Sequence, residues 1–434
     1  MHAYFSGIGG AGIGPLALVA RQAGYTVSGS DKQHNSYIDY LAGHGIQDVH
    51  IGQTYDQIAR VHAQQAIDWY VYSSAITKEQ SDAPELRFCR EHNIKATKRD
   101  EFLSNLINQK QLKLLAVAGT HGKTTTTAMA IWLFKQLGLP VSYSVGGKLS
   151  FGDMGEYNPK SEYFIYEADE FDRNFLAFHP HLSLIAGIDY DHADIYPTIN
   201  EYTAAFRQFI NQSSHTVLWQ DDVTRLRLKS ANNLTILDKR SPSIATELHL
   251  PGIVNRQDAW LVAQAVQTLT DTPLKELLAH LNRFPGIGRR FEQIAPHIYS
   301  EYAHTPPKIR GALQLAHEVA GDNVVVVYEG LHNTRQHFIK DELYSLFEGV
   351  KKLYVVPSYL AREDPNLPLL SPEDLIKLCS PEVQKRAEPA QLDDALREHI
   401  RAHAAANDLV LCISAGGGGS LDEWLRRDIE GASA

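Results

Sequence analysis

Residues 112–137 constrain the fold of this chain more than any other segment. Leu112 to Ala118 form an apolar run of strand length, and Thr124 to Leu137 have the pattern of a helix that Gly138 and Pro140 end. Only a short turn containing glycine separates the two predicted elements. A strand that passes through glycines into a helix is the repeating unit of α/β folds with mostly parallel sheets.

The same order of elements recurs on both sides of this segment. The chain begins with an apolar strand, His2 to Ser6, followed by glycines and the helical pattern of Pro15 to Gln22. The C-terminal region alternates helical patterns with four predicted strands at Ile298 to Tyr302, Val324 to Tyr328, Leu353 to Val356 and Leu409 to Ile413. A chain of 434 residues accommodates two to four domains of roughly 100–200 residues. We predict three α/β domains in series, at 1–104, 105–293 and 294–434.

Charge, hydropathy and cysteine content exclude several classes of protein. The formal net charge is −10, which disfavours a general nucleic-acid-binding surface. The sequence has neither a long apolar run nor a basic N-terminal stretch followed by one, so we expect no membrane insertion and no secretory signal. The three cysteines lack metal-binding spacing and predict free thiols in a cytoplasmic protein: Cys89, Cys379 and Cys412.

The turn between the strand and the helix of residues 112–137 has the composition of a phosphate-binding loop. Its glycines allow the backbone to wrap round phosphate oxygens, and the N–H groups at the start of the helix point at the same anion. Lys123 supplies positive charge for the β- and γ-phosphates, and Thr124 offers a hydroxyl to Mg²⁺. The spacing is shorter than that of the common P-loop, and a glycine turn with a chance lysine is the alternative. We predict an ATP-Mg site at Gly119, Thr120, His121, Gly122, Lys123, Thr124 and Thr125.

Acidic residues follow the next predicted strand, at 163–166. Four carboxylates lie between positions 167 and 172, and open α/β sheets bind ligands at the carboxyl ends of their strands. Mg²⁺ takes oxygen ligands and usually only one or two protein carboxylates. We therefore predict that Glu167 is a magnesium ligand, with a solvated acidic turn as the alternative.

A second acidic segment follows the predicted strand at 182–188. His192 lies there among Asp189, Asp191 and Asp194. A single histidine is more often structural or exposed, but this one is expected at the same end of the same sheet as the phosphate-binding loop. We predict that His192 contacts a second metal ion or a phosphate.

The glycines of the N-terminal region allow two interpretations. Gly7, Gly9 and Gly12 follow a strand, and Asp31 comes about 20 residues later, as in the NAD-binding fingerprint. The physical inference is only that a pyrophosphate can bind at this helix N-terminus. UDP carries a pyrophosphate as well, so the loop alone is compatible with NAD and with a UDP-sugar.

Taken together, these segments resemble the Mur ligases, which join amino acids or peptides to UDP-N-acetylmuramic acid. The family's Gly-Thr-x-Gly-Lys-Thr, Glu-Ala-Asp-Glu and Asp-His patterns match at 119–124, 167–170 and 191–192. The segments at 289–292 and 302–306 are similar to its arginine-rich hinge and its Tyr-Ala-His-x-Pro turn. The resemblance covers essentially the whole chain. It implies a Rossmann-like UDP-binding domain, a P-loop-type central ATPase domain and a Rossmann-like C-terminal domain.

The resemblance also implies a role for particular residues. Catalysis is expected from Lys123, Glu167, His192 and Arg290, with two Mg²⁺ sites at Thr124, Glu167 and His192. Beyond the phosphate-binding loop, ATP is expected to contact Asn255, Arg290, Glu301 and His304. The UDP-sugar is expected at Gly9, Gly10, Ala11, Gly12, Ser30, Asp31, Ser73, Ser74 and Ala75.

The implied reaction is amide-bond formation by carboxylate activation. The lactyl carboxylate of UDP-N-acetylmuramate would attack the γ-phosphate of ATP, and an amine would then attack the resulting acyl phosphate. Phe206 stands where some relatives carry a carbamylated lysine. That replacement argues against the diaminopimelate- and glutamate-adding branches and favours the branches that add L-alanine or a recycled tripeptide. We expect L-alanine, with the tripeptide as the alternative. Arg335 and His332 are expected to bind the amine substrate. We expect a cytoplasmic bacterial enzyme, monomeric or homodimeric.

Several positions depart from the family pattern. Glu301 replaces the usual aspartate, Gly187 replaces an asparagine, and His332 stands where the alanine-adding branch has an arginine. In the segment that contacts the nucleotide base, residues 252–259, Asn255 alone keeps its amide. Two interpretations of another class therefore stay open: an NAD-dependent oxidoreductase and a non-catalytic nucleotide-binding homologue.

Overall fold

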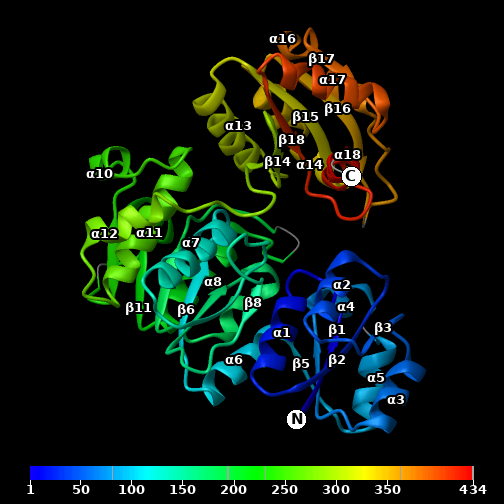
Figure 1. Ribbon diagram of the computed structural model, residues 1–434, viewed down its shortest axis with the longest axis vertical. Helices are drawn as coiled ribbons and strands as arrows, with labels where there is room; N and C mark the ends of the chain where they lie inside the picture. The colour runs from blue at the N-terminus through cyan, green and yellow to red at the C-terminus, as the bar shows by residue number, and fades with distance from the viewer. Residues whose placement is uncertain (81, 193–194, 230, 362, 433–434) are drawn as a thin grey trace. The chain divides into compact units, whose positions relative to one another are not determined.

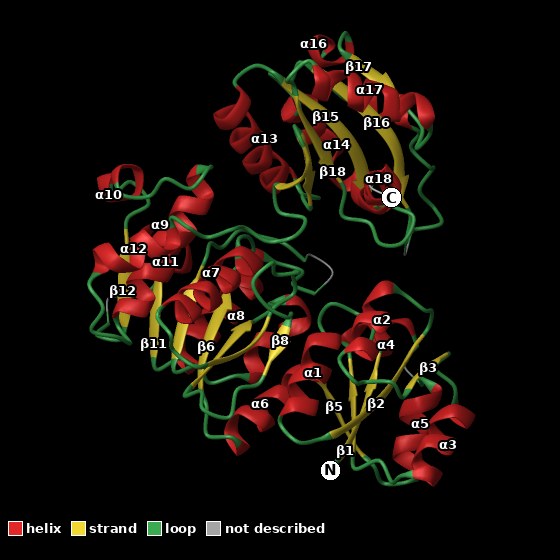
Figure 2. Ribbon diagram, viewed as in Figure 1, coloured by secondary structure: helices red, strands yellow, loops and turns green. Residues whose placement is uncertain are grey.

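The computed structural model describes residues 1–80, 82–192, 195–229, 231–361 and 363–432. These residues form two compact units, shown in Figure 1 and, by secondary structure, in Figure 2. The first unit comprises Met1–His249 with Arg256–Pro285, and the second comprises Leu250–Asn255 with Gly286–Ala434. The boundaries predicted at 104/105 and 293/294 stay predictions.

The first sheet of the first unit has five parallel strands in the order β3-β2-β1-β4-β5. All five residues of the central strand β1 are buried, as helices on both sides of a parallel sheet require. From β1 the chain adds strands on one side of the sheet, β2 and β3, and then on the other side, β4 and β5. Open α/β sheets bind nucleotides in the crevice where the order of strands changes side in this way. The strands are β1 His2–Ser6, β2 Thr26–Asp31, β3 Val49–Ile51, β4 Trp69–Tyr72 and β5 Lys95–Lys98; the helices are α1 Gly14–Gln22, α2 Ser36–Gly43, α3 Tyr55–Gln64, α4 Ser74–Glu79, α5 Pro84–Glu91 and α6 Arg99–Gln109.

The central sheet, also in the first unit, has seven strands in the order β12-β11-β10-β6-β9-β7-β8. All are parallel except β8, a two-residue strand that pairs antiparallel with β7. The strands are β6 Lys113–Ala118, β7 Val141–Ser144, β8 Gly155–Glu156, β9 Tyr163–Glu167, β10 Leu182–Ile185, β11 His215–Trp219 and β12 Leu234–Leu237. The helices are α7 Lys123–Gln136, η1 Phe171–Ala177, α8 Ile199–Gln212, α9 Gln220–Leu226, α10 Pro242–Thr246, α11 Ile253–Gln267 and α12 Leu274–Leu281.

Helices α1 and α6 lie between the two sheets of the first unit and join them into one body (Figure 1). One hydrophobic core runs through both sheets, from Phe5 of β1 to Phe164 of β9. The start of α1 packs so closely on β8 that a Cβ at Gly155 would lie 2.2 Å from Pro15 O. The carboxyl ends of the two sheets are therefore held in a fixed relation by packed side chains.

The second unit contains a six-stranded sheet in the order β13-β14-β18-β15-β16-β17, parallel except for β13. Two hydrophobic clusters fill its two faces. The strands are β13 Glu292–Ala295, β14 Ile298–Glu301, β15 Val324–Leu331, β16 Lys352–Tyr359, β17 Ala387–Pro389 and β18 Leu409–Ile413. The helices are α13 Pro306–Ala320, α14 Asn333–Leu346, α15 Pro372–Lys377, α16 Pro381–Gln384, α17 Asp394–Ala405 and α18 Leu421–Ala432.

The predicted fold class, α/β with mostly parallel sheets, is confirmed. All three cysteines are buried free thiols, as expected. Among the described residues, no helix is long and apolar enough to cross a membrane.

Candidate active site

The phosphate-binding loop connects β6 to α7, and two of its glycines are required by geometry. Gly119 has φ 139°, and a Cβ there would lie 2.9 Å from Gly187 O. Gly122 has φ 77° at the N-cap of α7, a left-handed conformation that glycine adopts without steric cost. The departure from the family at Gly187 thus lies directly against the loop, and Gly187 O accepts a hydrogen bond from Thr120 N at 2.7 Å.

Thr120 and His121 tie the loop to the segment after β10. The Thr120 hydroxyl donates to Asp189 O at 2.7 Å and accepts from Asp189 N at 2.9 Å. His121 Nε2 lies 3.5 Å from the Asp189 carboxylate, which also pairs with Arg225 at 2.7 Å. Hydrogen bonding from His121 and the charge of Arg225 hold the pKa of Asp189 below its ordinary value.

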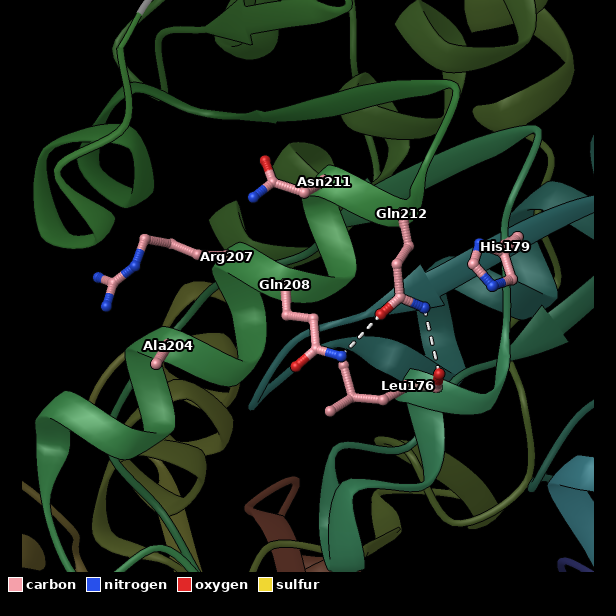
Figure 3. Close-up of a pocket in the computed structure, with 7 residues that line it drawn as sticks. All are labelled: Leu176, His179, Ala204, Arg207, Gln208, Asn211 and Gln212. Carbon is pink, nitrogen blue, oxygen red and sulfur yellow. Dashed lines mark hydrogen bonds between the residues drawn. The ribbon is translucent and has the colours of Figure 1, made fainter.

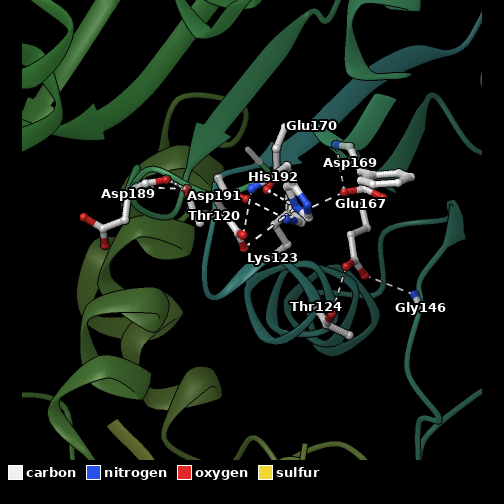
Figure 4. A network of polar contacts seen from close by, with 12 residues as sticks. Thr120, Lys123, Thr124, Gly146, Glu167, Asp169, Glu170, Asp189, Asp191 and His192 are labelled. Carbon is white, nitrogen blue, oxygen red and sulfur yellow. Dashed lines mark hydrogen bonds and ion pairs between the residues drawn. The ribbon is translucent and has the colours of Figure 1, made fainter. Parts of the chain in front are cut away.

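Lys123 is the centre of a buried network of charged groups, shown in Figure 4. Its Nζ donates to Gly119 O at 2.7 Å and to Glu170 Oε2 at 2.6 Å, and it lies 3.8 Å from Asp169 Oδ1. Glu170 is fully buried. Burial alone would raise the pKa of Glu170, but Lys123 and His192 hold it near 2. Glu170 is therefore ionised, and it fixes the lysine at the end of the loop.

His192 belongs to this network through Glu170. Its Nε2 lies 3.6 Å from Glu170 Oε1 and 3.9 Å from Asp191 Oδ2. Burial opposes the charge on His192, but the neighbouring Glu170 and Asp191 raise its pKa above the ordinary value. The structure thus places His192 against a carboxylate. Asp194, which belongs to the same acidic segment, lies outside the described residues.

Glu167 occupies a different position from its acidic neighbours. Its Oε1 accepts a hydrogen bond from the Thr124 hydroxyl at 2.9 Å, and its Oε2 accepts one from Gly146 N at 3.1 Å. It forms no ion pair with a described lysine, arginine or histidine, so its charge is available for a cation. Mg²⁺ bound through one carboxylate, a hydroxyl and nucleotide phosphates fits this pair of side chains. No group of three or more histidine, cysteine or acidic residues suited to a metal ion occurs among the described residues.

The first glycine loop, between β1 and α1, is organised by β2. Gly7 N and Ile8 N donate to Ser30 O at 2.8 and 3.0 Å, and Gly9 N donates to Asp31 Oδ2 at 2.8 Å. These bonds leave the backbone of Gly10, Ala11 and Gly12 at the surface, at the N-terminus of α1. The arrangement can hold a pyrophosphate.

The side chain of Ser30 points into the molecule. Its hydroxyl donates to Glu85 Oε1 at 2.6 Å, and the same carboxylate accepts from Ser6 at 2.5 Å, Tyr4 at 2.9 Å and Tyr70 at 3.1 Å. Glu85 is 1% exposed. Four hydroxyl donors saturate the oxygens of a carboxylate. Ser30 therefore contributes its backbone to the loop, while its side chain helps to anchor β1, β2 and β4 to α5.

Ser73, Ser74 and Ala75 lie where β4 passes into α4, beside the first loop. A Cβ at Gly7 would lie 3.7 Å from the Ser73 hydroxyl. The Ser74 hydroxyl faces Asn174 of η1 at 3.4 Å. The predicted UDP-sugar residues of β1, β2 and β4 are thus brought together at one edge of the sheet.

In the second unit, Arg290, Glu301 and His304 lie together at the start of the domain. The guanidinium of Arg290 lies 4.5 Å from the centre of the Tyr302 ring, and the guanidinium of Arg289 lies 4.7 Å from the same ring centre. Glu301 Oε2 accepts a hydrogen bond from Phe291 N at 2.8 Å. The pKa of His304 is held well below its ordinary value by burial and by three cations: Lys308, Arg335 and Arg290. Burial and these cations therefore disfavour the charged form of His304.

The side chain of Arg335, on α14, has no hydrogen bond or ion pair with any described residue. His332 precedes the helix with φ 57°, and its Nδ1 lies 3.6 Å from Glu363 Oε1. Asn255 belongs to the second unit, where its side chain donates to Pro251 O at 2.8 Å.

A surface pocket of about 710 Å³ lies on α8, outside these clusters (Figure 3). Its carboxamides bond to each other and to the backbone: Gln208 donates to Gln212 at 3.0 Å, and Gln212 donates to Leu176 O at 3.1 Å. Its lining contains no carboxylate: Leu176, His179, Ala204, Arg207, Gln208, Asn211 and Gln212.

Comparison with known proteins gives matches along the chain. Residues 2–111 match the Mur ligase family catalytic domain, residues 117–249 the Mur ligase middle domain, and residues 289–416 the Mur ligase glutamate ligase domain. The UDP-N-acetylmuramate–L-alanine ligase of Clostridium acetobutylicum is 30% identical over 394 residues, which cover 83% of each chain. The protein of that name from Renibacterium salmoninarum is 31% identical over 449 residues, covering 95% of this chain and 92% of the relative. The chain belongs to the Mur ligase family.

Solved structures of Mur ligases share its fold. The UDP-N-acetylmuramate–alanine ligase of Thermotoga maritima superposes with a TM-score of 0.78 at 23% identity, covering 100% of this chain and 99% of that one. The murein peptide ligase of Psychrobacter arcticus gives a TM-score of 0.67 at 21% identity, covering 100% and 98%. The resemblance proposed from the sequence motifs is confirmed.

Sequence reasoning missed two residues of this Mur ligase that contact its loops. Glu85 lies in the first turn of α5, between Pro84 and Leu86, and only its tertiary contacts distinguish it from an ordinary helix-start glutamate. Arg99 lies next to Gly12 of the first loop and is 3.5 Å from Asp169. No strand was predicted before Arg99, and no motif covers it, so the sequence carried no signal for its role.

Proposed function

We propose that this Mur ligase is an ATP-dependent ligase that joins the lactyl carboxylate of UDP-N-acetylmuramate to L-alanine in peptidoglycan precursor synthesis. The observation that carries the proposal is the arrangement of Lys123, Glu167 and His192 at the carboxyl ends of β6, β9 and β10. The choice of substrates rests on the relatives named above. ATP would bind at the Gly119–Thr125 loop, and the UDP-sugar at the Gly9–Gly12 loop.

The residues of the central sheet would stabilise the transfer of the γ-phosphoryl group mainly by charge and position. Lys123 would neutralise phosphate oxygens at the loop, and Glu170 would keep its ammonium aimed there. Thr124 and Glu167 would hold Mg²⁺, which neutralises and orients the nucleotide phosphates. A second magnesium ion beside His192 requires that histidine to be neutral, whereas its neighbour Glu170 favours the charged form. The contact that supports a bound ion is therefore the one between Thr124 and Glu167.

The proposed chemistry has two steps. A carboxylate oxygen of the muramyl group attacks the γ-phosphorus, and ADP leaves. The amine of L-alanine then attacks the carbonyl carbon of the acyl phosphate, and inorganic phosphate leaves with that carboxylate oxygen. Because the acyl phosphate reacts with water, exclusion of solvent from the site is part of the mechanism.

The cations of the second unit would bind the remaining anionic groups. Arg290 would contribute positive charge to ATP, next to Glu301 and His304. Arg335 would pair with the carboxylate of the amine substrate, for which its guanidinium is suited. Its lack of a carboxylate partner among the described residues supports this role.

A tripeptide-adding ligase is the second candidate, favoured by the segment His332-Asn333-Thr334. Asn333 donates to Pro368 O at 3.0 Å, and Thr334 N donates to Glu363 at 2.8 Å, so this segment shapes the loops that follow β16. Those loops contact the residues just before Arg335 in the chain and would set the size of the amine that is accepted. A monomer or a homodimer is proposed for either activity, and sedimentation distinguishes the two.

The test is phosphate release measured with ATP, Mg²⁺ and UDP-N-acetylmuramate, together with L-alanine, glycine, the cell-wall tripeptide or no amine. The proposal predicts release that requires both the UDP-sugar and L-alanine, with a product heavier by one alanyl residue in mass spectrometry. Release with the tripeptide alone would replace the proposal by the second candidate. Binding of both nucleotides without any product would indicate a non-catalytic homologue, and NAD binding without UDP-sugar binding would contradict both ligase activities.

A further inference from the structure

Arg99 lies at the point where the two sheets of the first unit meet. It is the first residue of α6, directly after β5. Its side chain is 18% exposed and extends between the first glycine loop and the acidic residues that follow β9. Neither the sequence motifs nor the proposed reaction assigns it a role.

One edge of the guanidinium lies directly against the first glycine loop. An ideal Cβ placed at Gly12 would be 1.6 Å from Arg99 Nη1 and 2.8 Å from its Cζ. No side chain other than hydrogen is therefore compatible with Arg99 in this position. Gly12 is the third glycine of the loop, at the start of α1, where N–H groups can receive a pyrophosphate.

The other edges of the guanidinium are held by two carboxylates. Arg99 Nε lies 3.2 Å from Asp100 Oδ2, and Nη2 lies 3.5 Å from Asp169 Oδ2. Asp100 is buried and accepts a hydrogen bond from the Tyr166 hydroxyl at 2.7 Å. A rigid, planar cation fixed on two sides presents its third side in a defined direction. Here that direction is toward Gly12.

The first loop has no cation of its own. The segment from Gly7 to Gly14 contains no lysine or arginine, and the charged group that contacts it from β2 is the Asp31 carboxylate. A doubly charged pyrophosphate bound at the N-terminus of α1 gains only a partial charge from the helix. The guanidinium of Arg99 supplies a full charge within contact distance of the loop.

We propose that Arg99 binds an anionic oxygen of the sugar nucleotide held on the Gly9–Gly12 loop. This inference rests on the proposed function for the identity of the ligand. The anionic oxygen belongs either to the diphosphate or to the muramyl carboxylate, because both are recognised by a guanidinium in the same way. Through Asp169, which lies 3.8 Å from Lys123, the same arginine also connects the sugar-nucleotide loop to the ATP loop.

The matched control is Lys98, the residue immediately before Arg99. Lys98 Nζ pairs with Asp172 Oδ2 at 2.6 Å, so it also connects the first sheet to the acidic segment after β9. Unlike Arg99, it makes no close approach to Gly12. Lys98→Gln removes a comparable ion pair without touching the proposed anion site.

The experiment is calorimetric titration of Arg99→Gln, Arg99→Lys, Lys98→Gln and the unaltered protein with UDP-N-acetylmuramate, UDP-N-acetylglucosamine and ATP. A charged hydrogen bond lost to a ligand weakens binding by about 10- to 100-fold, and this loss is expected for UDP-N-acetylmuramate with Arg99→Gln. ATP affinity is expected to stay at the unaltered level, and Lys98→Gln should bind all three ligands normally. An equal loss with UDP-N-acetylglucosamine, which has no carboxylate, assigns the contact to the diphosphate; a loss confined to UDP-N-acetylmuramate assigns it to the carboxylate.

Arg99→Lys keeps the experiment decisive if the glutamine variant does not fold. Lysine retains the charge beside Asp100 and Asp169, but its single ammonium cannot hold both carboxylates and the ligand. Its affinity for UDP-N-acetylmuramate should fall by at least about tenfold, with a thermal melting temperature close to that of the unaltered protein. Variants that fold and bind the sugar nucleotide as tightly as the unaltered protein overturn the role of Arg99. Failure of the unaltered protein to bind any UDP-sugar overturns the proposed function and the Arg99 inference together, whereas normal binding without product formation overturns the proposed function alone.

Discussion

The two glycine loops of the first unit are built alike in the backbone and differ in their charges. Each loop connects a buried strand to the N-terminus of a helix, and each lies at the carboxyl edge of a parallel sheet. The second loop carries its own cation, Lys123, paired with the buried Glu170 at 2.6 Å. The first carries none and is anchored by a carboxylate, Asp31, which accepts a hydrogen bond from Gly9 N at 2.8 Å.

In the proposed function, this difference in charge corresponds to a difference in role. The first loop binds a nucleotide that stays intact, and the second binds a nucleotide that reacts. Backbone N–H groups at a helix N-terminus are sufficient to bind a pyrophosphate that remains intact. Transfer of a phosphoryl group needs full positive charges that are already in place where negative charge develops. The second loop has Lys123, and the proposed function places Mg²⁺ beside it at Glu167. The first loop relies on one arginine supplied by α6.

The largest effect should follow from removing the cation of the second loop. Lys123→Ala is expected to reduce turnover by about 1,000-fold, because it removes charge stabilisation from the transferred phosphoryl group. UDP-N-acetylmuramate affinity should not change. Kinetics of phosphate release and calorimetry of sugar-nucleotide binding provide the two measurements. Lys135→Ala is the control, since Lys135 lies on the same helix and pairs with Glu156 at 2.9 Å. Full activity of the Lys123 variant would contradict the proposal that the cation of the second loop takes part in phosphoryl transfer.

A smaller effect is expected from neutralising the proposed magnesium ligand. Glu167→Gln keeps an acceptor for the Thr124 hydroxyl but loses the negative charge, so the Mg²⁺ concentration for half-maximal rate should rise about 10- to 100-fold. Titration of the rate with MgCl₂ measures this change. Glu162→Gln, at an exposed ion pair with Lys113 just before the same strand, should titrate like the unaltered enzyme. An unchanged magnesium requirement in the Glu167 variant would place the metal elsewhere.

Removing Asp31, whose carboxylate holds the first loop, should weaken the binding of the sugar nucleotide only. Asp31→Ala removes the acceptor of Gly9 N, and we expect UDP-N-acetylmuramate affinity to fall about tenfold with ATP affinity unchanged. Asp39→Ala, an exposed residue of α2 paired with His34, is the control. Equal losses of affinity for the two nucleotides would show that the loops are not independent.

The smallest predicted effect concerns stability beside the second loop. Asp258 is buried against Gly122, where a Cβ would lie 3.0 Å from its carboxylate, and burial raises the pKa of Asp258 to about 8. An aspartate in the unfolded chain has a pKa of about 3.9. The folded state therefore binds the proton more tightly, and the free energy of unfolding falls as pH rises between these two values.

Asp258→Asn removes this titration and restores the amide of the family pattern. The variant should melt higher than the unaltered protein at pH 8 and above, and the difference should become smaller as pH falls toward 4. Thermal melting followed at several pH values checks the sign. A difference in melting temperature that does not depend on pH would contradict the assignment of the titration to Asp258.

The sequence predicted the strands of both loops well, because apolar runs bounded by glycines or acids leave little choice. Strand β1 has the predicted ends, and β6 begins one residue later than expected. The short strand β8 was not predicted, since its two residues lie in a polar segment. They pair with β7 and pack closely against α1.

The sequence also placed the acidic residues at the correct edge of the central sheet. It could not predict which partner each carboxylate contacts. Glu167, Asp169 and Glu170 are close in sequence, yet one faces Thr124, one faces Arg99 and one is buried against Lys123. Such differences depend on the turn after β9 and on side chains from other elements. Ser30 shows the same limit, because its inward orientation depends on Glu85, a residue of another helix.

The most direct test of the account follows one oxygen atom through the reaction. UDP-N-acetylmuramate labelled with ¹⁸O in both oxygens of its lactyl carboxylate is incubated with ATP, Mg²⁺ and L-alanine, and the released phosphate is analysed by mass spectrometry. The account predicts that each phosphate carries one ¹⁸O, because the carboxylate oxygen attacks the γ-phosphorus bound at the second loop and leaves with it. Phosphate without the label would mean that water attacks ATP, and it would contradict carboxylate activation at this site.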